Sequence, residues 1–224
     1  MKRLGVFGGT FDPVHWGHLR PAAAVLAGFA LDALVFVPAA APPHKLDEPV
    51  SSFAHRFAML ALATARHDGF LLSDVEQRRD GPSYTVDTLR EIRAAWRAET
   101  VFFILGSDSL AQITTWHRWE TLVALAHLVV LRRDPLWGIE LERHVPPLFR
   151  PRLQLVDPSR GIELAAAGAC AGSIFLLEHQ PYPISATTVR QRLRAGLEAR
   201  ELVPPEVERY AVKNRLYHHG ERGD

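Results

Sequence analysis

Short apolar runs alternate with longer amphipathic segments through the first 131 residues. Residues 4–7, 33–37, 70–72, 101–105 and 127–131 are rich in Val, Leu and Phe, which is typical of strands buried on both faces of a parallel sheet. Between these runs, apolar residues recur at helical spacing over 19–29, 53–60 and 86–96. This order of strands and helices predicts an α/β fold with a doubly wound, mostly parallel sheet.

The region over 134–172 is less regular, because five prolines interrupt it and a run of small residues ends it. Alternating apolar residues indicate a short strand at 153–155, and the run SIFLLE indicates a clearer one at 173–178. We therefore expect the sheet to continue past this irregular region.

The last forty residues predict helices rather than strands. Ser185 or Thr187 is a candidate N-cap for a helix that Gly196 ends, and a second helix follows the next pair of prolines. The chain has no tandem repeat and no long polar linker. We expect one domain over 1–224, with a C-terminal helical part over 183–224.

Charge and cysteine content narrow the class of protein. Of the 224 residues, 26 are Lys or Arg and 25 are Asp or Glu, so the net charge is +1 and no global field favours nucleic acid or an anionic membrane. The single cysteine, Cys170, excludes an intrachain disulfide framework. The apolar run at the start is too short for a signal peptide or a membrane span. We expect a cytoplasmic protein with neither nucleic acid nor membrane as its partner.

The motif GGTFDPVHWGH stands directly after the first predicted strand. Its glycines let backbone N–H groups approach a ligand, and the next helix begins near Trp16. His15 and His18 lie three residues apart and share one helix face, which Gly17 keeps open to a bulky anion. Ligands of doubly wound sheets bind at such strand ends, so the motif predicts a phosphate site. It lacks the fingerprints of a dinucleotide fold or a P-loop.

The parts of this motif also have structural interpretations. A glycine pair alone is usually a turn, and a lone histidine is usually a satisfied polar residue. His15 and His18 also suggest a transition-metal pair, but we expect no third ligand from the nearby sequence to complete the shell. We expect Asp12 to hold the loop through side-chain bonds to backbone rather than to bind a metal.

GGTFDPVHWGH resembles the signature of the HxGH nucleotidyltransferase superfamily. Eight later segments resemble its bacterial nicotinate-nucleotide adenylyltransferase branch, in the same order: PPHK, RFAML, GPSYTVDTL, LGSDSL, WHRW, LRRD, ISATTVR and YAVKNRLY. PPHK, SYT and WHRW carry the substrate assignment, since HxGH alone specifies only the superfamily. The family commonly has ISST where this chain has ISAT, so Ala186 removes one hydroxyl.

The resemblance implies a Rossmann-like nucleotidyltransferase fold and a specific reaction. ATP and nicotinate mononucleotide would give nicotinate adenine dinucleotide and pyrophosphate, a step in the biosynthesis of NAD. The attacking phosphate monoester has a second pKa of about 6, so it is already largely dianionic and needs no general base. Mg²⁺ is expected on the ATP phosphates, with no metal site on the protein.

By the same resemblance, His18 would stabilise the α-phosphate in the transition state, His15 would contact the triphosphate, and Arg190 would take the β- and γ-phosphates. The residues expected to bind ATP are Gly8, Gly9, Thr10, Phe11, His15, His18, Gly106, Asp108, Arg133, Ser185, Thr187 and Arg190. The residues expected to bind the acceptor nucleotide are Lys45, Tyr84, Thr85, Asp108 and Trp116, with Trp116 as a stacking platform.

Some of these residues have structural alternatives, and the function has rivals. Trp116 could be a core or interface residue, Lys45 an exposed loop residue and Arg190 part of a solvated helix face. A sister adenylyltransferase acting on nicotinamide mononucleotide or phosphopantetheine would use the same phosphate machinery. A non-catalytic nucleotide-binding module is a rival of another class, and a nucleic-acid-binding protein is supported only by short basic segments. The sequence leaves open whether copies of the chain form a homo-oligomer.

Overall fold

The computed structural model describes residues 1–40, 50–132, 139–157, 172–178 and 182–217. Lys45, Arg133 and Cys170 lie outside these residues, so the predictions made for them are not addressed by the structure.

Within the described residues, seven parallel strands form a single sheet in the order β3-β2-β1-β4-β5-β7-β6. The strands are β1 (Arg3–Gly9), β2 (Ala33–Pro38), β3 (Phe70–Leu72), β4 (Thr100–Gly106), β5 (His127–Leu131), β6 (Leu153–Val156) and β7 (Ile174–Leu177). Every strand pairing is parallel, which confirms the predicted α/β class and places both late strands in the same sheet.

The helices of the described residues are α1 (Trp16–Gly28), α2 (Phe53–Thr64), α3 (Thr85–Trp96), α4 (Ser107–Ala111), α5 (Leu122–Leu125), α6 (Ile139–His144), α7 (Ala186–Arg194) and α8 (Pro205–Lys213), with 3₁₀ turns η1 (Ile113–Thr115), η2 (Trp119–Thr121) and η3 (Arg150–Arg152). The five longest were predicted. The three short helices between β4 and β6 were missed, because four to six residues are too few to show a helical period.

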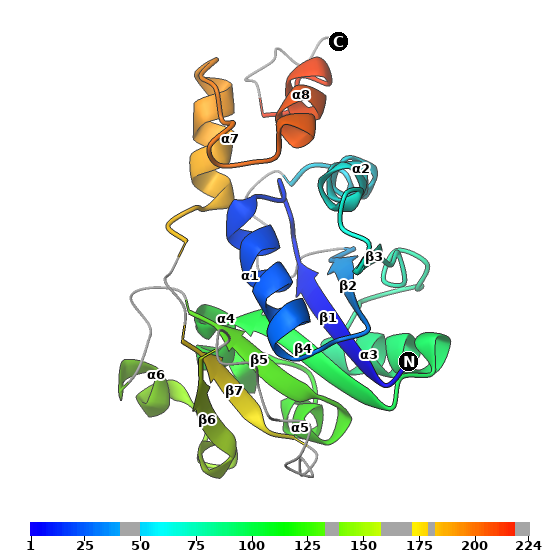
Figure 1. Ribbon diagram of the computed structural model, residues 1–224, viewed down its shortest axis with the longest axis vertical. Helices are drawn as coiled ribbons and strands as arrows, with labels where there is room; N and C mark the ends of the chain where they lie inside the picture. Colours follow the sequence, from blue (N-terminus) through cyan, green and yellow to red (C-terminus); the bar gives the residue numbers. More distant parts are fainter. Residues whose placement is uncertain (41–49, 133–138, 158–171, 179–181, 218–224) are drawn as a thin grey trace.

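Alternate residues of each strand enter two separate cores. On β1, Phe7 packs into a core with α1, α2, α7 and α8, whereas Leu4 and Val6 pack into a core with α3 and the short helices α4, α5 and α6. Figure 1 shows α1 in front of the sheet and α3 behind it. The central strands are therefore buried on both faces, as their uniform apolarity predicted, whereas the edge strand β6 is partly exposed.

The strand order reverses between β1 and β4, because β2 follows β1 on one side and β5 follows β4 on the other. Phe7 pairs with Ile104, so Gly9 and Gly106 end their strands side by side. This is the topological switch point at which a doubly wound sheet binds ligands. In Figure 1, α7 and α8 lie beyond this end of β1.

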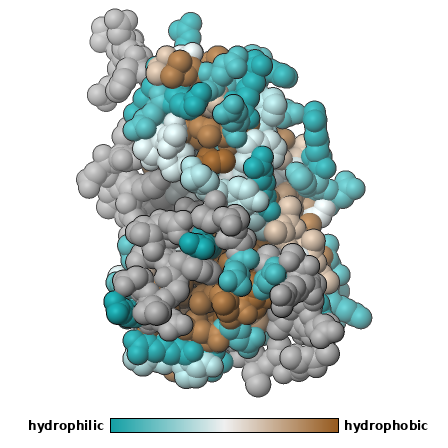
Figure 2. All heavy atoms as spheres, turned by 60° about the vertical axis from the view of Figure 1, so that its left-hand side comes forward, coloured by the Kyte–Doolittle hydropathy of each residue, from teal (hydrophilic) through white to brown (hydrophobic). Residues whose placement is uncertain are grey.

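The hydropathy of the surface differs between the two ends of the long axis. On the face in Figure 2, hydrophilic side chains cover most of the end that holds α7 and α8, and a larger apolar area lies toward the opposite end. Within the described part of the chain, every helix is too short or too polar to traverse a bilayer.

Candidate active site

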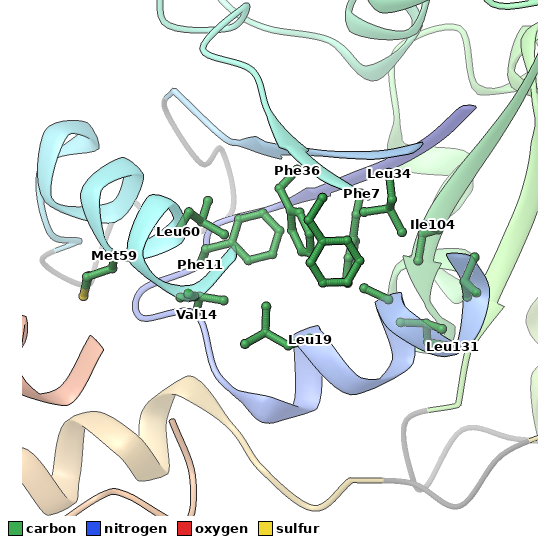
Figure 3. Close-up of a cluster of buried hydrophobic side chains, with 14 of the residues drawn as sticks. Phe7, Phe11, Val14, Leu19, Leu34, Phe36, Met59, Leu60, Ile104 and Leu131 are labelled. Carbon is green, nitrogen blue, oxygen red and sulfur yellow. The ribbon is translucent and has the colours of Figure 1, made fainter. Parts of the chain in front are cut away.

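The segment between β1 and α1, residues 10–15, is anchored by an aromatic ring; we call it the β1–α1 loop. Phe11 adopts a left-handed backbone conformation (φ 51°) and buries its ring against Phe7 and Phe36 (Figure 3). A Cβ on Gly9 would lie 3.0 Å from that ring, so glycine is needed there. The ring fixes the loop backbone at the switch point, where its N–H groups can meet an anion.

His15 and His18 lie together at the start of α1. His15 is the N-cap residue and His18 the third residue of the helix, and their rings stack with centroids 3.7 Å apart. The prediction that they share one face is confirmed. The His15 backbone N–H donates to His18 Nδ1 at 3.3 Å, so neutral His18 carries its proton on Nε2. This bond orients the imidazole as a hydrogen-bond donor.

Gly17 is required for a reason that differs from the expected one. A Cβ at this position would lie 2.9 Å from the His15 ring and 3.3 Å from the Ile184 carbonyl oxygen. The missing side chain therefore lets the His15 ring fold back over α1 and lets the segment before α7 approach the helix. The glycine shapes the histidine pair, whereas the sequence suggested that it only cleared space for a ligand.

Asp12 connects the β1–α1 loop to two distant parts of the chain. Its Oδ2 accepts from the Ser51 N–H at 3.0 Å, and its Oδ1 accepts from the Tyr217 hydroxyl at 2.6 Å. Its carbonyl oxygen accepts from Arg190 Nη1 at 2.9 Å. The carboxylate does bond to backbone, as expected, but to the segment before α2 rather than within its own loop.

Arg190 is buried beside the loop, which contradicts the solvated-face alternative. Its Nη2 donates to Thr187 Oγ1 at 3.3 Å on the preceding turn of α7. Ser185 is the N-cap of α7, and its Oγ accepts from the Thr188 N–H at 3.0 Å. Of the two candidate N-caps, the structure selects Ser185, which leaves Thr187 as the hydroxyl next to Arg190.

Arg56 is a loop-holding residue that the sequence analysis did not single out. It is 2% exposed and donates to three carbonyl oxygens, those of Ser51 (3.0 Å), Thr10 (2.9 Å) and Ala40 (3.4 Å). Burial lowers the pKa of the guanidinium, while the nearby carboxylate of Asp12 opposes this shift. A signal was present, because Arg56 occupies the buried stripe of α2 where an apolar residue is expected.

A second group of predicted residues gathers on the other face of the sheet. The Tyr84 ring stacks on His117 with centroids 4.2 Å apart, which brings the N-terminus of α3, where Thr85 lies, to the WHRW segment. Trp116 is partly buried and packs edge-on against Phe103 of β4. A Cβ on Gly8 would lie 3.6 Å from the same Phe103 ring, so this group adjoins the end of β1.

Asp108 follows the end of β4 and is exposed in the first turn of α4, and Gly106 is the N-cap of that short helix. The described residues thus place Gly8, Gly9, the loop, both histidines, Arg190 and the Tyr84–Trp116 group around one end of β1 and β4. Among these residues, no group of three or more His, Cys, Asp or Glu is arranged to hold a metal.

A hollow in the described surface lies elsewhere, between α7 and α8. It measures about 690 Å³ and is lined by residues from the end of α7, the connection after it, and α8, including Leu193, Leu197 and Val212. None of the predicted site residues lines it. We therefore describe the site at the switch point by its side chains and their hydrogen bonds.

Residues 6–192 match the family described as Cytidylyltransferase-like. A protein from Geobacter metallireducens is 38% identical to this chain, and the match covers 97% of this chain and 99% of that protein. A protein from Pseudomonas fluorescens is 40% identical, and the match covers 96% of this chain and 97% of that protein. Both are named "Probable nicotinate-nucleotide adenylyltransferase". The solved Plasmodium falciparum nicotinic acid mononucleotide adenylyltransferase complexed with NaAD is similar in fold, with a TM-score of 0.70 at 19% identity over 97% of this chain and 98% of that one.

The sequence relatives span the whole chain, and the fold places the HxGH histidines at the switch point of the sheet. The chain therefore belongs to the nicotinate-nucleotide adenylyltransferase family of cytidylyltransferase-like proteins.

Proposed function

We propose that this enzyme transfers the adenylyl group of ATP to nicotinate mononucleotide. An oxygen of the nucleotide's phosphate attacks the α-phosphorus of ATP, the bond from that phosphorus to the bridging oxygen breaks, and pyrophosphate leaves. The observation that carries the proposal is the stacked pair of His15 and His18 at the start of α1, in a chain 38% identical over its length to a relative named for this reaction.

Catalysis in this proposal consists of positioning and charge stabilisation. The attacking phosphate is already dianionic near neutral pH, so the site needs donors and cations rather than a base. His18, with its proton on Nε2, donates to the α-phosphate, and His15 contacts the triphosphate beside it. The start of α1 adds the positive end of its dipole.

Arg190 supplies positive charge to the departing β- and γ-phosphates, with Ser185 and Thr187 beside it. Thr10 and the backbone at Gly8, Gly9 and Phe11 line the phosphate path. In this arrangement the C-terminal part, residues 183–224, completes the ATP site of a single domain. Arg190 bonding to the Asp12 carbonyl and the Leu202 carbonyl accepting from the Trp16 N–H, both at 2.9 Å, support this role.

Mg²⁺ enters as part of the substrate, on the ATP phosphates. Asp12 is the one carboxylate of the β1–α1 loop, and each of its oxygens already accepts a hydrogen bond from the protein. The donor set of the loop therefore fits phosphate oxygens better than a bare divalent cation. An ATP-consuming reaction and a single cysteine both fit the cytoplasm, the compartment that we propose.

The acceptor's pyridine ring would stack on Trp116, and the backbone at Tyr84 and Thr85 would donate to its carboxylate. A pocket that presents N–H groups leaves the NH₂ of an amide unpaired, which favours nicotinate over nicotinamide mononucleotide. Asp108 would accept from a ribose hydroxyl at the end of β4. We further propose that Lys45 contacts the acceptor nucleotide and that Arg133 borders the adenine of ATP.

The deciding experiment measures pyrophosphate release from Mg-ATP with nicotinate mononucleotide, nicotinamide mononucleotide and phosphopantetheine offered in parallel. We expect release with the nicotinate acceptor at least tenfold faster than with either other acceptor. Faster release with another acceptor would keep the phosphate chemistry and overturn the assignment of Tyr84, Thr85 and Trp116. No release with any of them, despite ATP binding, would identify a nucleotide-binding module.

A further inference from the structure

We propose that Tyr217, near the end of the chain, is a positioning residue of the active site that acts through Asp12. The inference rests on the proposed function, because the loop that it positions is the one assigned to phosphate. Tyr217 lies 205 residues from Asp12 in sequence, yet its hydroxyl donates to Asp12 Oδ1 at 2.6 Å.

The surroundings of the Tyr217 hydroxyl favour its role as a hydrogen-bond donor. It lies against Asp12 Oδ1 on one side and 4.0 Å from the Met59 sulfur of α2 on another. Burial, together with the neighbouring Asp12 carboxylate, raises the pKa of the phenol well above its usual range. Near neutral pH the proton therefore stays on Tyr217, which lets the hydroxyl donate to Asp12.

Asp12 couples the Tyr217 hydroxyl to the β1–α1 loop. The residue is 3% exposed, so its carboxylate depends on protein donors, which are the Ser51 N–H and the Tyr217 hydroxyl. Its own carbonyl accepts from Arg190, the cation assigned to the departing phosphates. Moving Asp12 would therefore shift the β1–α1 loop and Arg190 together. An error of about 1 Å at such a site costs roughly 100-fold in rate.

The same C-terminal segment provides a matched control. Tyr210 of α8 also bonds to the α2 region, through its hydroxyl and His55 Nδ1 at 3.0 Å. That hydrogen bond joins α8 to α2, whereas the hydrogen bond of Tyr217 reaches the β1–α1 loop. Tyr210→Phe and Tyr217→Phe each remove one hydroxyl from one segment, and only the second removes it from Asp12.

The experiment compares both variants with the wild-type enzyme in kcat, KM for each substrate, ATP affinity by calorimetry and melting temperature. We expect Tyr217→Phe to lower kcat/KM about tenfold, through a lower kcat and a weaker affinity for ATP, and Tyr210→Phe to change it less than twofold. Asp12→Asn changes the other partner of the same hydrogen bond, the carboxylate in the loop. Because Tyr217 acts through Asp12, adding Tyr217→Phe to Asp12→Asn should lower kcat/KM by less than twofold more.

Wild-type kcat/KM in Tyr217→Phe, with a loss of stability like that of Tyr210→Phe, would overturn the inference and leave the contact a fold-stabilising one. Fully multiplicative losses in the double variant would overturn it as well. Failure of the wild-type enzyme to release pyrophosphate with any acceptor would contradict the proposed function instead. In that case the ATP affinity of the three single variants decides the positioning role, which requires weaker binding in Tyr217→Phe than in Tyr210→Phe.

Discussion

The two histidines of the site are arranged by their immediate neighbours. The His15 N–H orients His18, and the missing side chain of Gly17 makes room for the His15 ring. The edges of Phe7 and Phe11 meet the His18 ring from the core side. These contacts fix both imidazoles before any ligand binds, which reduces the reorganisation that the reaction would require.

Replacing His18 with alanine should remove a donor to the transition state while leaving most ATP contacts in place. We expect kcat to fall about 10²- to 10³-fold, the usual cost of losing one such donor, and the ATP dissociation constant to change only a few fold. Pyrophosphate release and calorimetry with ATP measure the two effects. Turnover near the wild-type rate would refute the role of His18.

Gly17→Ala tests the histidine arrangement without removing a histidine. The new Cβ would lie 2.9 Å from the His15 ring and 3.3 Å from the Ile184 carbonyl oxygen, so the ring and the segment before α7 must shift. This cost offsets the preference of a helix for alanine over glycine, about 1 kcal/mol. We expect a roughly tenfold lower kcat with a melting temperature close to that of the wild-type enzyme. Unchanged kcat would show that the position of the His15 ring is not critical.

At the scale of elements, α2 stabilises the loop from outside. Arg56 reaches from the buried face of α2 to carbonyl oxygens of three other segments, at Thr10, Ala40 and Ser51. The planar guanidinium suits this task, because its N–H groups point in several fixed directions. The helix thus contributes a buried cation where an amphipathic helix usually contributes an apolar side chain.

Arg56→Met keeps the volume of the side chain but leaves these carbonyl oxygens without a donor. We expect the free energy of unfolding to fall by about 3 kcal/mol, as measured by urea denaturation. Arg66 lies just past the end of α2 and forms an ion pair with Glu206 at a side-chain exposure of 86%. Arg66→Met should therefore cost less than about 1 kcal/mol. Equal losses would contradict the structural role of Arg56.

At the scale of the whole molecule, the C-terminal segment contacts elements near the N-terminus. Arg190, Leu202 and Tyr217 each bond to the β1–α1 loop or the start of α1, and Tyr210 bonds to α2. These contacts span nearly the full length of the sequence. Stability and the geometry of the loop therefore depend on the same long-range bonds.

Tyr217 makes this dependence measurable as a function of pH. Its folded-state pKa is raised, so above the usual tyrosine value of about 10 the folded state holds the proton more tightly than the unfolded state does. The stabilisation is complete below that pH and declines as the pH rises further. Urea midpoints between pH 8 and 11.5 should fall more steeply for the wild-type enzyme than for Tyr217→Phe.

Parallel slopes for the wild-type enzyme and Tyr217→Phe would contradict a raised pKa at Tyr217.

The sequence by itself determined the fold class and the centre of the site. Apolar runs such as 127–131 identified buried strands, because a strand covered on both faces must be apolar throughout. The spacing of His15 and His18 placed both on one face, because helical geometry is local. Local sequence likewise limited the N-cap of α7 to two candidates, one of which was Ser185.

Tertiary structure alone decided how these pieces are held. The bonds from Arg56 to Thr10, from Arg190 to Asp12 and from Tyr217 to Asp12 join residues 46, 178 and 205 positions apart, and no local pattern encodes such pairs. The reason for Gly17 likewise depends on where Ile184 lies. Periodicity and capping act over a few residues, whereas the placement of buried charges depends on which segments packing brings together.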